Sequence, residues 1–80
     1  MDENLFIMEK FYHTITYNGH WAVQSMKNPE PTKLFDTQAD AWHETVRLAR
    51  ISKGEAVLHA DDGQVLVRES YMNHLFPKNK

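Results

Sequence analysis

The chain has 80 residues, a formal net charge of −2 at pH 7 and no cysteine. A chain of this length forms one small domain, and the lack of cysteine excludes a disulfide framework and a thiolate metal site. Hydrophobic residues make up 41% and charged residues 25% of the chain, a composition typical of an ordinary globular domain. The slightly negative charge argues against strong non-specific binding of nucleic acid, although it leaves room for a local basic patch.

The N-terminal residues carry no recognisable targeting signal. Leu5–Met8 is a short apolar run with acids ahead of it, unlike the long apolar core of a signal peptide. No window of the sequence reaches the length of a membrane span, so we expect a cytoplasmic protein. We predict an N-terminal extension over residues 1–9, either disordered or forming an added strand. A single compact domain over residues 10–76 and a frayed tail over 77–80 are expected to follow.

Two runs rich in aromatic and β-branched residues, Lys10–Tyr17 and His20–Met26, predict the first two strands. Asn18-Gly19 between them predicts a two-residue hairpin turn, because both turn positions take positive φ. That turn pairs Tyr17 with His20 and so divides the hairpin into two faces. One face is predicted to carry Phe11, His13, Ile15, Tyr17, His20, Ala22, Gln24 and Met26. The other is predicted to carry Tyr12, Thr14, Thr16, Trp21 and Val23.

Two prolines make Lys27–Phe35 a predicted loop, with a brief edge strand at Lys33–Phe35 as the alternative. Asp36–Lys53 is then predicted to form the helix. Thr37 is a good N-cap residue, and Gly54 is the expected left-handed residue after the last turn. One face of this helix collects small and apolar side chains that suit packing against a sheet. They are Gln38, Ala41, Trp42, Thr45, Leu48, Ala49 and Ser52.

Glu55–Ala60 and Gln64–Ser70 read as two further strands around the compact turn Asp61-Asp62-Gly63. Two hairpins that flank one helix give the order ββαββ. We therefore predict an α+β fold, a two-layer sandwich in which one helix packs on one face of a four-stranded antiparallel sheet. The sequence leaves open which face the helix covers.

The chain resembles a bacterial family known only as domain of unknown function 2188. The shared features are an ordered series of short motifs over about residues 11–71. They are Tyr12-His13, Gly19, Trp21-x-Val23, Thr37-Gln38-Ala39-Asp40-Ala41, Leu48-Ala49, His59, Asp62-Gly63 and Ser70-Tyr71. The chain departs from the family pattern at Gln24, Thr45, Val46 and Met72. The resemblance implies the fold and a bacterial or phage setting, and it implies no activity and no functional residues.

Neither a catalytic site nor a cofactor site can be assembled from the sequence. The serines have no nearby base, and turn chemistry explains Asp61-Asp62, so we expect no enzyme and no cofactor. The five histidines show neither i,i+4 nor H-x-H spacing, so no metal site is predicted. His13 and His59 could meet if their strands were neighbours, which keeps a metal pair as the less favoured alternative.

A single helix covers one face of a sheet, yet large apolar residues occur on both predicted faces. We therefore expect a non-catalytic protein-interaction or accessory module, which forms a homodimer or binds another protein through the uncovered face. The candidate interface residues are Tyr12, Trp21, Val23, Val57, Val65 and Val67. Two alternatives stay open. Tyr71–Phe76 or Leu5–Met8 could cover that face, or a nucleic acid could bind the basic helix stripe formed by Arg47, Arg50 and Lys53.

Overall fold

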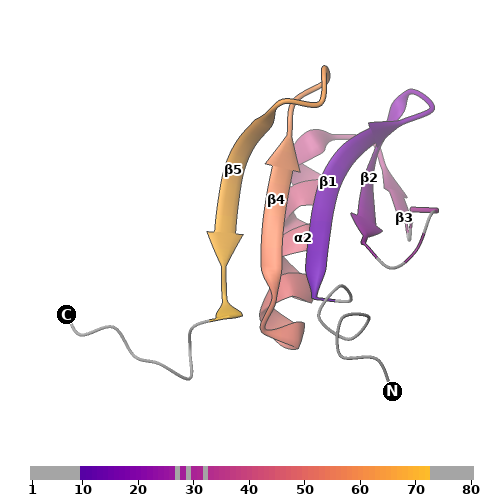
Figure 1. The fold of residues 1–80 in the computed structure, drawn as a ribbon. Helices are drawn as coiled ribbons and strands as arrows, with labels where there is room; N and C mark the ends of the chain where they lie inside the picture. The colour runs from indigo at the N-terminus through magenta and orange to yellow at the C-terminus, as the bar shows by residue number, and fades with distance from the viewer. Residues whose placement is uncertain (1–9, 27, 29, 32, 73–80) are drawn as a thin grey trace.

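The computed structural model describes residues 10–26, 28, 30–31 and 33–72. Our predictions for residues 1–9 and for the tail beyond Met72 lie outside these residues. Within the described part, the chain forms five strands and one helix (Figure 1). In chain order they are β1 (Phe11–Tyr17), β2 (His20–Ser25), β3 (Lys33–Phe35), α2 (Gln38–Ser52), β4 (Glu55–His59) and β5 (Val65–Ser70).

The strands form one mixed sheet in the order β3-β2-β1-β4-β5. The α+β class and the single helix on one face agree with the prediction, but the four-stranded antiparallel sheet was wrong in two respects. The sheet has a fifth strand, β3, which confirms the alternative given for Lys33–Phe35, and β4 runs parallel to β1 with Tyr12 opposite Ala56. The other three pairings are antiparallel.

The short strand β3 explains the parallel pair. It pairs with β2, with Ala22 opposite Leu34, and therefore runs in the same direction as β1. Helix α2 then carries the chain back across the sheet, so β4 points in the direction of β3 and hence of β1. Without β3, the same helix would have delivered β4 antiparallel to β1, as predicted.

The first hairpin matches the prediction closely. Tyr17 pairs with His20, Ile15 with Ala22 and His13 with Gln24. Asn18 and Gly19 both have positive φ, at 52° and 80°, as a two-residue turn of this kind requires. The predicted division of the two strands between faces therefore holds.

Helix α2 starts where its capping signal predicts and ends slightly differently. The Thr37 hydroxyl accepts a hydrogen bond from the Asp40 backbone N–H at 3.1 Å. The left-handed residue at the C-terminal end is Lys53, with φ 59°, and not Gly54 as predicted. Gly54 is needed for a different reason, because a Cβ there would lie 1.8 Å from the Lys10 carbonyl oxygen. This close approach lets Glu55 N–H bond to that carbonyl at 2.8 Å, where β4 begins beside β1.

The helix covers the sheet face that carries Thr14 and Val23, because small side chains on both layers let the backbones come close. Figure 1 shows the helix behind the sheet when β1 and β4 point upward, so the β3–α2–β4 crossover is right-handed, as nearly all are.

The helix lies over β4, β1 and β2 and reaches β3, whereas β5 lies beyond it (Figure 1). The fully buried residues come from the helix and from both faces of the sheet. They are Thr14, Ala22, Val23, Ala41, Thr45, Ala49, Ala56 and Val57.

Candidate functional site: the open face of the sheet

The second face of the sheet has no described helix or strand packed against it (Figure 1). The strand registers place Phe11, His13, Ile15 and Tyr17 of β1 on this open face. Their neighbours on it are His20, Ala22 and Gln24 of β2, Leu34 of β3, and Glu55, Val57 and His59 of β4. The open face is therefore mainly apolar and aromatic, with two histidines near its centre.

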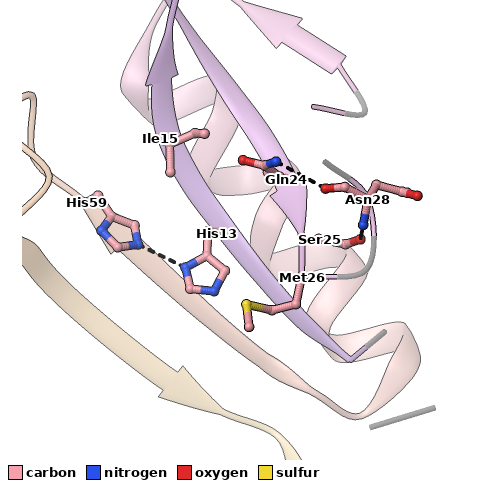
Figure 2. A pocket seen from close by; sticks show the side chains of 7 residues that line it. All are labelled: His13, Ile15, Gln24, Ser25, Met26, Asn28 and His59. Atoms are coloured by element: carbon pink, nitrogen blue, oxygen red, sulfur yellow. Dashed lines mark hydrogen bonds between the residues drawn. The ribbon is translucent and has the colours of Figure 1, made fainter. Parts of the chain in front are cut away.

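A hollow of about 400 Å³ lies on this face where β1, β2 and β4 run side by side (Figure 2). Its lining residues are His13, Ile15, Gln24, Ser25, Met26, Asn28 and His59. The turn after β2 holds one rim, because the Gln24 side-chain amide donates to the Asn28 carbonyl at 3.1 Å. Asn28 N–H in turn donates to the Ser25 carbonyl at 3.2 Å.

His13 and His59 meet in this hollow, because β1 and β4 are neighbours and both side chains point to the open face. The Nδ1 atom of His13 lies 2.9 Å from the Nε2 atom of His59. The ring centroids are 5.1 Å apart and the ring planes differ by 28°. Since the two nitrogens are much closer together than the centroids, the rings meet edge to edge through a hydrogen bond.

The acceptors around the two histidines assign their tautomers. His59 Nδ1 lies 3.0 Å from the Gly63 carbonyl oxygen, which can only accept, so Nδ1 carries a proton. In neutral His59 the Nε2 atom is then the acceptor, and His13 must donate from Nδ1. The remaining nitrogen, His13 Nε2, is left as a bare lone pair. It is buried and has no hydrogen-bond partner within the described residues.

Burial lowers the pKa of His13 below its ordinary value of 6.5, because a charged ring loses hydration in this position. The neighbouring His59 and Arg68 lower it further, while Glu55 opposes them. Arg68 and Glu55 form an ion pair of 2.9 Å beside the histidines, which limits the effect of either charge alone. Together these effects favour the neutral form of His13.

The six predicted interface residues do not form one surface. Tyr12, Trp21 and Val23 lie on the face that the helix covers, with Val23 fully buried. Val57 is on the open face but is fully buried between its register neighbours on β1 and β5. Only Val65 and Val67 are exposed, on the outer strand β5.

The basic stripe on the helix is largely engaged by neighbours. Arg47 forms two hydrogen bonds to Glu44, at 2.9 and 2.7 Å, and this contact lowers the pKa of the Glu44 carboxyl. The Arg50 guanidinium lies over the Tyr71 ring, 5.7 Å from its centroid. Lys53 is the exposed left-handed residue that closes the helix. The three side chains thus occupy the helix surface, away from the hollow.

From the sequence, contact between His13 and His59 was predicted only on the condition that their strands are neighbours. Met26 was not predicted to lie near them. The signal for Met26 was present in the hairpin register. Because Met26 N–H bonds to the Phe11 carbonyl, Met26 is diagonal to His13 on the same face. The additional condition, that β4 adjoins β1 in parallel, could not be read from the local pattern.

Comparison with known families places this chain. It matches a family described as uncharacterized protein conserved in bacteria (DUF2188) over residues 12–71, and it belongs to that family. No curated protein and no solved structure matched the chain. None of the described helices is both long and apolar enough to cross a membrane.

Proposed function

We propose that this family member is a non-catalytic protein-interaction module that associates with a second copy of itself through the open sheet face. The observation that supports it most directly is the apolar face opposite the helix. Leu34 is 46% exposed and Met26 is 52% exposed there. Exposed apolar groups on one contiguous sheet face are typical of protein interfaces.

The charge of this face favours a second copy as the occupant. Within the described strands, the charged side chains that the registers place on the open face are Glu55 and Arg68. They neutralise each other at 2.9 Å. Two identical faces related by a two-fold axis therefore meet without like-charge repulsion. Dimerisation also suits an 80-residue chain, because a core of this size alone gives marginal stability.

Sedimentation of the full chain tests this proposal. The wild-type protein should sediment at about twice its chain mass of 9.4 kDa, with a monomer appearing on dilution. Leu34→Glu places a charge on the open face and should shift the protein to monomer. The matched control is Ile51→Glu, which charges a more exposed aliphatic residue (68%) on the solvent side of the helix and should leave the dimer intact. A wild-type monomer at all accessible concentrations would refute the proposal.

The alternative function, association with nucleic acid through the basic helix stripe, has weaker support. Glu44 holds Arg47 in a bidentate pair, so a phosphate would have to compete with a carboxylate already in place. A double charge reversal at Arg50 and Lys53 separates the two functions. It should leave sedimentation unchanged, whereas loss of a measurable oligonucleotide affinity of the wild type would favour the nucleic-acid function.

A further inference from the structure

The hollow contains three side chains with metal-binding atoms in a row: His59 of β4, His13 of β1 and Met26, the residue after β2. Figure 2 shows the His13 ring between the other two, with one nitrogen bonded to His59 and the second turned away from it, on the side of Met26. We propose that His13 Nε2 and Met26 Sδ are the ligands of a copper(I) ion, and that His59 is the residue that positions His13.

The hydrogen-bond chain prepares His13 for this role. The Gly63 carbonyl fixes the proton of His59 on Nδ1, and His59 Nε2 then fixes the proton of His13 on Nδ1. A metal-binding histidine commonly donates its non-ligating N–H to a carboxylate, a backbone carbonyl or water, which sets its tautomer and ring orientation, and here the neutral His59 Nε2 takes the place of that acceptor. The atom left over, His13 Nε2, is the buried nitrogen without a partner. A buried polar atom without a partner is uncommon, and a bound ion is one explanation for it.

The donor set selects the metal. No group of three or more His, Cys, Asp or Glu side chains with the geometry of a metal site occurs in the described part of the chain. The other soft donor that lines the hollow is the thioether of Met26. Thioether sulfur favours copper(I), and imidazole also binds copper. Both donors are neutral, and the adjacent Arg68 and Glu55 cancel each other, so a monovalent ion requires less charge compensation here than a divalent one.

The Met26 side chain can move to let an ion enter the hollow. This side chain is unbranched and 52% exposed, so it can rotate to admit an ion and then close over it. Its backbone is fixed by the hydrogen bond from Met26 N–H to the Phe11 carbonyl at 3.1 Å. The sulfur is therefore tethered beside His13 while its own torsions stay free.

The test is an anaerobic titration of the full chain with copper(I), in competition with a chromophoric copper(I) chelator. Silver(I), a copper(I) analogue that is not oxidised, allows the same site to be read by NMR. The chain has four methionines, so their ε-methyl signals distinguish Met26 from the others. We expect one equivalent of silver(I) to shift the Met26 methyl and the His13 Nε2 resonance.

Substitutions assign the roles. Met26→Leu keeps the size of the side chain and should weaken copper(I) binding at least tenfold, and His13→Gln should abolish it. His59→Ala should weaken binding about tenfold or more, as loss of a positioning partner does. It should also remove the preference of His13 for the Nδ1–H tautomer, which imidazole ¹⁵N shifts report. Met72→Leu and His43→Gln are the controls, because these exposed residues lie outside the hollow, and both should bind as the wild type does.

Three results would overturn the proposal. They are no competition with the chelator, unchanged affinity in Met26→Leu, or silver(I) shifts confined to the other methionines. Unfolding curves of each variant show whether lost binding reflects lost folding, and Met26→Leu decides if His13→Gln does not fold. Because the hollow lies on the face proposed for the dimer, the titration is repeated with the Leu34→Glu variant, which should be monomeric, so that failure of the copper(I) proposal and failure of the dimer are distinguishable.

Discussion

Two adjacent residues of β1, Thr14 and His13, point to opposite faces of the sheet, and their hydrogen-bond chains end differently. On the covered face, the Thr14 hydroxyl donates to Thr45 Oγ1 at 2.6 Å, and Thr45 donates to the Ala41 carbonyl at 2.9 Å. Each hydroxyl in this series of hydrogen bonds therefore has an acceptor. On the open face, the chain from His13 through His59 to Gly63 leaves His13 Nε2 without a partner.

This difference separates the structural face from the candidate functional face. Under the helix, small side chains and satisfied hydroxyls leave no group in need of a ligand, as expected where packing decides the sequence. On the open face, half-exposed apolar groups surround a nitrogen that the fold holds neutral. Three predictions test whether the two faces differ as described, from the largest expected effect to the smallest.

The largest effect should come from enlarging a buried alanine. Ala49 and Ala22 are both fully buried, but Ala49 lies between helix and sheet whereas Ala22 is on the open face. Ala49→Leu should destabilise the protein by about 2–3 kcal/mol, because the helix has to move away from the sheet. Ala22→Leu should cost less than about 1 kcal/mol, because no described helix or strand packs over it and would have to move. Urea denaturation measures both, and equal costs would contradict the distinction between the faces.

A smaller effect is expected from the buried hydroxyl pair. Thr45→Val removes the acceptor of the Thr14 hydroxyl and leaves a buried donor unpaired, so stability should fall by about 1–2 kcal/mol. The double variant Thr14→Val/Thr45→Val removes both hydroxyls at similar volume and should recover most of that loss. If the double variant is less stable than Thr45→Val alone, the hydroxyls stabilise the helix in some way other than by this hydrogen bond.

The smallest effect should be the pH dependence of stability that His13 causes. Burial, His59 and Arg68 lower its pKa below 6.5 in the folded protein, against the opposing effect of Glu55. Between this lowered pKa and pH 6.5, the unfolded chain therefore binds more protons than the folded protein. The contribution of His13 is complete above about pH 6.5 and is lost as the pH falls through the lowered pKa.

Denaturation curves at several pH values between 7.5 and about 5 measure this effect. His13→Gln should flatten the decline, while His43→Gln, at an exposed helix position, should not. A decline that is the same in both variants would assign the pH dependence to another group.

Local signals in the sequence predicted the elements whose contacts are close along the chain. Asn18-Gly19 fixed the hairpin register, and Thr37 marked the helix start, because these signals act over two or three residues. The buried stripe of the helix was also correct at Ala41, Thr45 and Ala49, since a period of 3.6 residues is visible over fifteen residues.

Tertiary structure alone decided the direction of β4 and the face that the helix covers. Lys33–Phe35 has three residues, too few to show the alternation of a strand, yet its pairing with β2 reverses the direction in which the chain enters the helix. That reversal makes β4 parallel to β1 and brings His59 to His13. The candidate site thus depends on a strand that the sequence pattern hardly marks, because sheet pairing is decided by contacts between distant residues.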